Sequence, residues 1–156
     1  GTLLPALAQI PGARLWVAGQ TLDAWQGMIR KLGLADRVTG LGRADLLPWY
    51  QAADWFVHPT HYDACANTVL QSMACGLPGL ISTADGASEF IREGENGSLL
   101  HHPGDAEELA MKLCWALGKS ESERQGIACA SRETVLPLTW GAHLSGWERA
   151  LNRFGV

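Results

Sequence analysis

Residues 61–79, with the sequence HYDACANTVLQSMACGLPG, combine two groups that can hold a ligand with a stretch of very small residues. Asp63 offers a carboxylate, and Gln71 offers an amide eight residues later. The Ala-Cys-Ala run at 64–66 leaves the first turn of the expected helix almost bare, where a surface helix normally carries longer side chains. The Gly-Leu-Pro sequence at 76–78 then ends the helix.

The start of this helix has the chemistry of an anion site. The first turn of any helix has N–H groups without an intrahelical acceptor and the positive end of the helix dipole. Small side chains let a phosphorylated or hydroxyl-rich ligand reach those groups. The residues alone leave a second interpretation open, in which Ala64 and Ala66 are small because they pack closely against a neighbouring loop.

Alternating strands and helices must position this site. Short apolar runs, each closed by turn residues, predict strands over 13–19, 37–41, 54–59, 79–83 and 97–102. The segments between and after them predict helices over 21–33, where Thr21 is the expected cap, and over 44–53, 85–93, 105–117, from Ser120 onward and 140–153. The strand at 54–59 leads into the site, and ligands of open parallel sheets bind at the carboxyl ends of strands.

This alternation predicts an α/β fold class. We expect a three-layer α/β/α Rossmann-like domain with a mainly parallel sheet that helices cover on both faces. The 156 residues suit one such domain. Residues 2–12 read as the tail of a helix with no strand before it, so we expect the chain to be a piece of a larger protein.

Composition excludes several classes of function. A net charge of −4, with no dense stripe of Lys and Arg, argues against nucleic-acid binding. No apolar run approaches the roughly 20 residues that span a bilayer, and the first residues do not resemble a signal peptide. The four cysteines form no Cys-x-x-Cys pair, which favours a reduced, cytoplasmic location.

Residues 41–100 also resemble a known family. The Asp-x7-Gln spacing, MACGLPG, DGASEFI and GENG fall in the order found in the nucleotide-binding half of retaining GT-B glycosyltransferases. The sequence is most similar to proteobacterial enzymes that add glucose or heptose to the lipopolysaccharide core. The resemblance covers roughly residues 13–117 and implies that 1–156 is the C-terminal donor-binding domain, with the N-terminal acceptor domain and the first strand absent.

The resemblance implies a role for each residue of the site. Asp63 takes the place of the first Glu of a Glu-x7-Glu pattern, which holds hydroxyls of the donor sugar, and is the candidate catalytic residue. Gln71 takes the place of the second Glu, which binds the ribose diol. Backbone amides then face the sugar from Ala64, Cys65 and Ala66 and the diphosphate from Asn67 and Thr68. The base lies against Gly42 and Arg43, with Gly19 close by.

Two departures from the family pattern weaken donor binding. Asp63 is one methylene shorter than Glu, and Gln71 has no charge. A neutral hydrogen bond contributes about 0.5–1.5 kcal/mol against about 1.5–3 kcal/mol for a charged one, so the exchange at Gln71 weakens nucleotide binding by up to about tenfold. The family's Gly-Arg…Lys-Gly stretch, which grips the diphosphate, does not precede Leu3. We therefore expect this chain alone to be inactive.

For the full-length enzyme, the resemblance implies retaining transfer of a hexosyl or heptosyl group from UDP-glucose or a similar nucleotide sugar. The lipopolysaccharide-core acceptor binds the N-terminal domain, at the cytoplasmic face of the inner membrane. No metal is expected, since helix-terminus amides stabilise the departing diphosphate and no Asp-x-Asp motif occurs. Two alternatives stay open: a degenerate sugar-nucleotide-binding module without transfer activity, and a sugar-nucleotide epimerase.

Several residues near the site have simpler interpretations. His58 ends a strand and is expected to be a structural histidine, whereas His61 and Tyr62 border the donor site. Asp85 is expected to cap a helix. The pair at 101–102 is expected to lie in an exposed loop. Finally, Trp140 and Trp147 share one face of the last helix, which we expect to contact the absent domain and to promote association without it.

Overall fold

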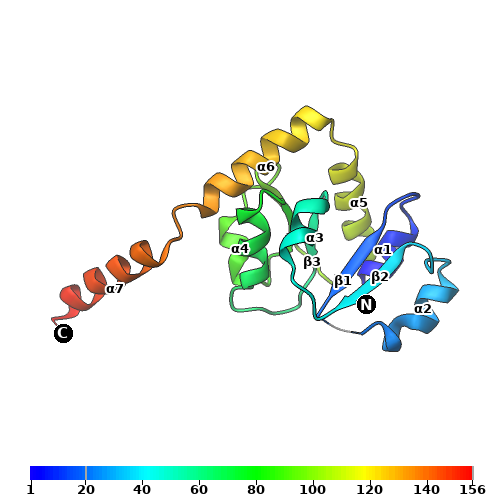
Figure 1. Ribbon diagram of the computed structural model, residues 1–156, viewed down its shortest axis with the longest axis horizontal. Helices are drawn as coiled ribbons and strands as arrows, with labels where there is room; N and C mark the ends of the chain where they lie inside the picture. The colour runs from blue at the N-terminus through cyan, green and yellow to red at the C-terminus, as the bar shows by residue number, and fades with distance from the viewer. Residues whose placement is uncertain (20, 156) are drawn as a thin grey trace.

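The computed structural model describes residues 1–19 and 21–155. Helices and strands alternate along it and confirm the predicted α/β class (Figure 1). The elements are α1 (Leu3–Ala8), β1 (Leu15–Ala18), η1 (Asp23–Trp25), α2 (Gln26–Lys31), β2 (Val38–Gly42), α3 (Leu47–Ala52), β3 (Phe56–His58), α4 (Asn67–Ala74), β4 (Gly79–Ser82), η2 (Gly86–Phe90), β5 (Gly97–Leu100), α5 (Ala106–Leu117), α6 (Glu121–Val135) and α7 (Trp140–Phe154).

All five strands pair in parallel, as predicted, but they form two sheets instead of one. β1 pairs with β2, and β3, β4 and β5 form a second sheet in that order. Each connection between neighbouring strands carries a helix, which is what parallel pairing requires. Within the described residues, the predicted parallel sheet is divided in two, because β1 and β3 do not pair.

The second sheet is covered on both faces. All four residues of β4 are buried, and its two central side chains enter different apolar clusters. Leu80 packs with residues of α1 and α5, while Ile81 packs with residues of α4 and η2. The sheet of β1 and β2 has its own cluster with α1 and α2, centred on Ile29 and Leu34. This layering confirms the Rossmann-like architecture.

Some helices differ from the prediction because side chains and loops compete with regular helix. The segment expected at 21–33 begins as the single 3₁₀ turn η1, whose N-cap is Leu22, so the predicted Thr21 cap does not form. The segment expected at 85–93 is the 3₁₀ helix η2, and Asp85 caps it as predicted. α3 covers only part of the range predicted at 44–53, with a proline in its first turn.

The two predicted capping boxes have different outcomes. Ser120 and Glu123 form the reciprocal box at the start of α6, and hydrogen bonds from Ser120 help to lower the pKa of Glu123 to about 2. At α5, Asp105 accepts the first-turn amides, but the Glu108 carboxylate accepts the N–H groups of His101 and His102 instead. Burial alone would raise the pKa of Glu108, yet these donors hold it below its ordinary value.

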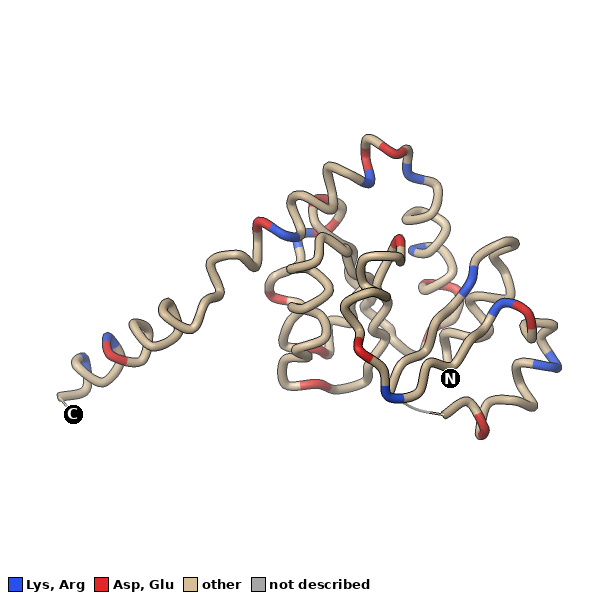
Figure 2. Tube along the Cα trace, in the orientation of Figure 1, with Lys and Arg blue, Asp and Glu red and all other residues tan. Residues whose placement is uncertain are grey.

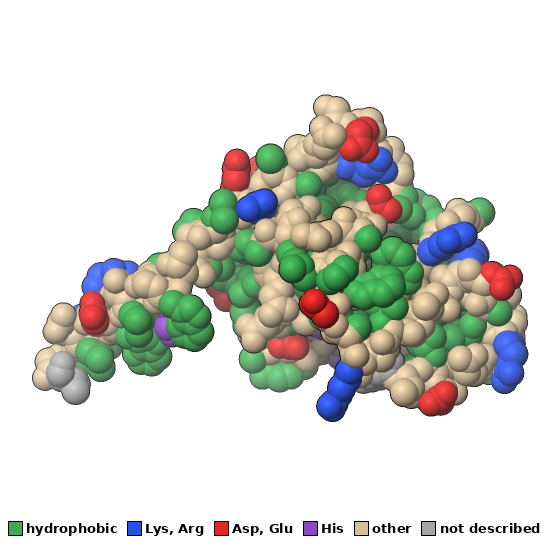
Figure 3. Space-filling model, in the orientation of Figure 1, with side chains coloured by type: hydrophobic (Ala, Val, Ile, Leu, Met, Phe, Trp, Pro, Cys, Tyr) green, Lys and Arg blue, Asp and Glu red, His purple; other side chains and the backbone are tan. Residues whose placement is uncertain are grey.

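The last helix projects away from the rest of the chain (Figure 1). Its apolar stripe, Trp140, Leu144, Trp147 and Leu151, is exposed along one side, where Figure 3 shows a row of hydrophobic side chains. Acidic and basic residues are scattered along the trace in Figure 2, without a dense basic stripe. Among the described residues, no helix is long and apolar enough to cross a membrane.

We expect the α7 stripe to drive self-association of the chain. Replacing Leu144 and Trp147 by Gln removes the centre of the apolar stripe. These two side chains are 59% and 58% exposed, so they are available to contact another copy of the chain. The parent chain should shift to larger species as its concentration rises, while the double variant stays monomeric in size-exclusion chromatography with light scattering. Ala142→Gln, on the opposite face, should behave like the parent. A strictly monomeric parent at every concentration contradicts the prediction.

Candidate functional site

Two loops that follow neighbouring strands are joined by backbone hydrogen bonds at the predicted site. The N–H of Asp63, in the β3–α4 loop, donates to the carbonyl of Ala84 at 3.1 Å, and the N–H of Gly86 donates to the carbonyl of Asp63 at 3.0 Å. These bonds form a short parallel bridge between Asp63 and Asp85. The bridge extends the pairing of β3 with β4 beyond the strands and fixes where Asp63 lies.

Gly86 is required by this close approach. A Cβ at position 86 would lie 1.9 Å from the carbonyl oxygen of Ala64, a distance at which the two backbones must move apart. The glycine therefore lets the loop that begins η2 lie directly against the loop that begins α4. The backbone of the bare first turn is held in place from one side as a result.

The buried carboxylate of Asp85 joins the starts of two helices. Its side chain is inaccessible to solvent, and Oδ1 accepts the N–H of Ala66 at 3.1 Å and that of Ala87 at 2.8 Å. The bond to Ala87 is the cap predicted from sequence. The bond to Ala66 was not predicted, because it joins residues 19 positions apart.

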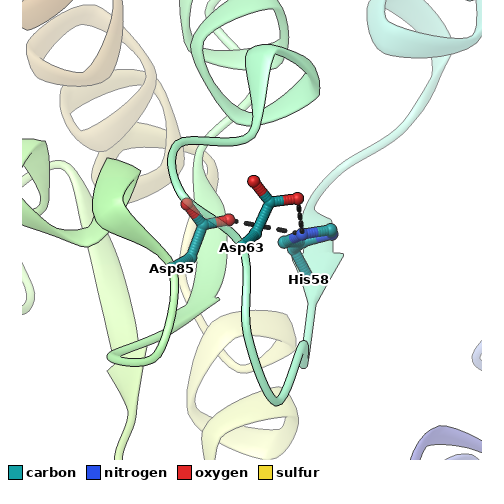
Figure 4. Close-up of side chains that lie close together, drawn as sticks. All are labelled: His58, Asp63 and Asp85. Carbon is teal, nitrogen blue, oxygen red and sulfur yellow. Dashed lines mark ion pairs between the residues drawn. The ribbon is translucent and has the colours of Figure 1, made fainter.

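His58, at the end of β3, faces the carboxylates of both Asp63 and Asp85 (Figure 4). Its Nε2 is 3.3 Å from Oδ2 of Asp85 and 3.9 Å from Oδ2 of Asp63. Neither His58 Nε2 nor Asp85 Oδ2 has a hydrogen-bond partner within the described residues, and both atoms are buried. Half-buried His58 stacks on Phe56, but it is not the fully hydrogen-bonded structural histidine that the sequence led us to expect, because its Nε2 faces the site without a partner.

The same three side chains form a group that can hold a metal ion. One ligand atom from each of His58, Asp63 and Asp85 lies within 4.8 Å of the other two. An imidazole with two carboxylates suits Zn²⁺ or Mn²⁺. Acidic groups also gather in proteins without an ion, so the expectation that no metal takes part stays a prediction.

The first turn of α4 has open backbone donors. Its N-cap, Ala66, provides no side-chain cap, and the turn contains no acidic residue. Within the described chain, no acceptor is found for the N–H groups of Asn67 and Thr68, as expected for the first positions of a helix. These two are the amides that the family resemblance assigned to the diphosphate.

The amides assigned to the sugar are placed differently. The N–H of Cys65 donates to Oδ1 of Asp63 at 3.1 Å, and the N–H of Ala66 is taken by Asp85. Ala66 is also buried in the apolar cluster under α4, whereas Ala64 and Cys65 are exposed. Burial, together with the carboxylates of Asp85, Glu89 and Asp63, raises the pKa of the Cys65 thiol. Cys65 is therefore a neutral thiol at neutral pH.

A cavity of about 1190 Å³ opens beside these loops. Gly19, Gly42, Arg43 and Thr68 all line it, so the structure brings together four of the residues predicted to bind the donor. Both glycines have positive φ, 92° and 59°, which allows the chain to turn away sharply at the ends of β1 and β2.

The remaining predicted residues lie outside the lining of this cavity. Asp63 is connected to it through His58, which does line it. Gln71 is exposed on α4, about one turn from the open amides of Asn67 and Thr68. Tyr62 is 81% exposed, and His61 is exposed beside it. Sequence reasoning missed the link from Asp85 to His58, because it joins two loops that follow different strands.

Comparison with known proteins identifies the family. Residues 2–119 match the family model described as "Glycosyl transferases group 1". The chain belongs to the group 1 glycosyltransferases. Its relatives include the lipopolysaccharide core biosynthesis glycosyltransferase LpsE of Rhizobium meliloti, which is 36% identical over 115 residues; the match covers 72% of this chain and 34% of LpsE.

Solved structures agree with the fold of a group 1 glycosyltransferase. Sucrose-phosphate synthase from Thermosynechococcus elongatus superimposes with a TM-score of 0.85 at 28% identity, over 97% of this chain and 42% of that enzyme. Anabaena Alr3699/HepE in complex with UDP gives a TM-score of 0.81 at 25% identity, over 99% of this chain and 44% of HepE. The chain thus corresponds to one Rossmann-like half of a GT-B fold and spans about a third to two-fifths of these proteins.

We expect the Asp85 carboxylate to be required for the stability of the site. Asp85→Ala leaves the N–H groups of Ala66 and Ala87 without an acceptor, so the free energy of unfolding should fall by about 2–4 kcal/mol in chemical denaturation. Asp85→Asn keeps an oxygen that accepts both bonds and should lose clearly less. Asp45→Ala is the matched control, since exposed Asp45 caps a single amide, that of Leu47. Equal losses for Asp85→Ala and Asp45→Ala would contradict the expectation.

Proposed function

We propose that this chain binds a nucleotide-diphosphate sugar, UDP-glucose or a similar donor, as the donor-binding half of a hexosyl- or heptosyltransferase. The observation that carries the proposal is the uncapped start of α4, next to small exposed residues and at the carboxyl ends of the strands. Open amides and the helix dipole together favour a diphosphate at this position. HepE, a structure with the same fold, was solved with UDP.

The arrangement of the site suggests where each part of the donor binds. The diphosphate accepts hydrogen bonds from the N–H groups of Asn67 and Thr68. The base lies toward Gly42 and Arg43, which line the cavity and of which Gly42 has no side chain to occupy it. Exposed Gln71 then reaches the ribose from the second turn of α4.

Asp63 is the residue proposed to hold the sugar. Its Oδ1 already accepts the N–H of Cys65, and Oδ2 lies 3.9 Å from His58, too far for a good hydrogen bond. Oδ2 is therefore free to accept a hydrogen bond from a hydroxyl group of the sugar. The backbone bridge to Asp85 fixes the position from which this shorter carboxylate must reach the sugar.

Transfer itself requires that the sugar–phosphate bond break while negative charge grows on the leaving diphosphate. Amides fixed at the start of a helix stabilise that charge without a metal, because they already point at the oxygen atoms. We propose retention of anomeric configuration, as the family resemblance implies. The acceptor is proposed to be a lipopolysaccharide core at the inner face of the inner membrane, held by a further domain; LpsE, 36% identical, is named for core biosynthesis.

Two other functions make different predictions for the full-length protein. A sugar-nucleotide-binding module without activity would bind the donor and leave it unchanged. This alternative is based on Asp63 and Gln71, which stand where the family pattern has two Glu residues. An epimerase would convert the sugar of the donor without an acceptor. Incubating the full-length protein with labelled donor, with and without core acceptor, distinguishes transfer, epimerisation and simple binding.

Removal of one amide should weaken nucleotide binding without disturbing the helix. Asn67→Pro deletes the N–H at the first position of α4, where proline is tolerated and where extended Ala66 suits a following proline. Calorimetric titration with UDP should show binding about tenfold or more weaker, the value of one charge-assisted hydrogen bond.

Ala106→Pro is the matched control, since it makes the same change at the first position of α5, far from the site in sequence and also after an extended N-cap. It should bind UDP as the parent does. Gln71→Glu should tighten binding by up to about tenfold. Titrations with ADP and GDP identify the base. Unchanged UDP binding by Asn67→Pro would place the diphosphate elsewhere.

Chelation should leave donor binding intact. If amides and not a metal hold the diphosphate, titration of UDP-glucose in EDTA should give the same affinity as titration in Mn²⁺. Thermal unfolding with Mn²⁺ or Zn²⁺ tests the cluster of His58, Asp63 and Asp85 directly. A metal-induced rise in melting temperature that His58→Gln abolishes would show that the cluster binds the ion and would overturn the metal-free expectation.

A further inference from the structure

Three carboxylates surround the part of the site that is proposed to hold the sugar. Asp63 and Asp85 come from the loops that follow β3 and β4, and Glu89 comes from η2. Burial raises the pKa of the exposed Cys65 thiol, and so do the negative charges of all three carboxylates. Figure 4 shows the carboxylates of Asp63 and Asp85 directed toward the ring of His58. The bare turn before α4 is therefore an electronegative part of the surface.

These charges are not balanced by lysine or arginine in the part of the chain that the structure describes. Among residues 1–19 and 21–155, Asp63 and Asp85 have only His58 as a basic neighbour, at 3.9 and 3.3 Å, and Glu89 has none within ion-pair distance. Carboxylates ordinarily carry a negative charge at neutral pH. Even a fully protonated imidazole would offset only one of the three charges. A net negative charge therefore remains in either state of His58.

The fold uses only one of the two carboxylate oxygens of Asp85. Oδ1 accepts two backbone N–H groups, whereas Oδ2 has no hydrogen-bond partner within the described residues, although the side chain is fully buried. A buried carboxylate oxygen without a partner costs stability. The amide oxygen of an asparagine would accept the same two bonds without the charge. Holding the two helix starts together thus does not explain why this residue is charged, and the charge points to a ligand.

The two ends of the proposed donor site differ in charge. The amides proposed to hold the diphosphate belong to Asn67 and Thr68, where the dipole of α4 is positive. At the sugar end, an oxygen of Asp63 lies within 4.8 Å of an oxygen of Asp85. The Asp63 side chain is 40% exposed, so a ligand from solvent can reach it. A charged group bound to Asp63 therefore interacts with the charge of Asp85 without touching that residue.

We propose that the site selects its donor by the charge of the sugar, and that Asp85 sets this preference. A sugar with a protonated amino group binds more tightly than a neutral hexose, because the ammonium group donates hydrogen bonds to Asp63 and is attracted by Asp85. A sugar with a carboxylate binds more weakly, because both aspartates repel it. The inference rests on the proposed function, since it assumes that the diphosphate binds at the start of α4.

Labelling of Cys65 measures the charge of the site without any nucleotide. Methanethiosulfonate reagents that carry a trimethylammonium or a sulfonate group label the same thiol and differ in charge, and mass spectrometry of peptides gives a rate for each cysteine. Compared with the uncharged model thiol N-acetylcysteine amide, Cys65 should favour the cationic reagent by at least about fivefold. Asp85→Asn should lower this preference by about twofold or more. The preference at exposed Cys129, on α6, should not change.

Titration with three donors then tests the choice of sugar. UDP-glucosamine should bind the parent chain at least about fivefold more tightly than UDP-glucose, and UDP-glucuronic acid at least about fivefold more weakly. Asp85→Asn should bring the three affinities closer together. The ratios between donors are the readout, because a merely structural role of Asp85 would weaken the binding of all three donors alike.

Glu108→Gln is the matched control. The Glu108 carboxylate also accepts two backbone N–H groups, but it is not among the groups that raise the pKa of Cys65. This variant should keep both the labelling preference at Cys65 and the donor ratios of the parent. Equal affinities for the three donors in a parent chain that binds UDP would overturn the charge selection and leave the proposed function standing. A parent chain that does not bind UDP at all would overturn the proposed function, and the selection with it.

Discussion

The arrangement of the site depends on the buried carboxylate of Asp85. One oxygen holds the starts of α4 and η2 together, and the other faces His58. Burying a carboxylate is costly unless hydrogen bonds compensate for lost hydration, and here two backbone N–H groups donate to Oδ1. The position of Asp63 follows from the same interaction, because the bridge between the two aspartates fixes its backbone. The proposed donor site is thus held by one charged group.

Local patterns in the sequence predicted most of the fold. The continuous apolar run at 79–83 indicated a strand covered on both faces, and β4 is buried throughout. Ser120 and Glu123 predicted a capping box because the two residues that form it are three apart. The helix expected at 85–93 is a 3₁₀ helix instead, since the Asp85 side chain and the contact of Gly86 with Ala64 decide its geometry. Those contacts lie about twenty residues away in sequence and have no local signal.

In the site, as in the fold, features set by neighbouring residues were predictable, and contacts between distant residues were not. The open amides of Asn67 and Thr68 follow from the start of a helix, which the sequence locates. The pairing of His58 with Asp85 does not, because it depends on which strands are neighbours in the sheet. Likewise, the parallel direction of the strands follows from the helices that connect them. The division into two sheets depends instead on whether β1 and β3 pair, which no local pattern indicates.

The small residues at 64–66, before α4, have two different explanations. The sequence left open either close packing or room for a ligand, and each applies to part of this segment. Ala66 is 6% exposed, lies in the core and gives its amide to Asp85, so packing requires it to be small. Ala64 and Cys65 are exposed, so burial in the core does not explain their size. Their small side chains leave the backbone open to a ligand that approaches from solvent. The two open amides that follow them, together with the positive end of the helix dipole, are suited to an anionic ligand.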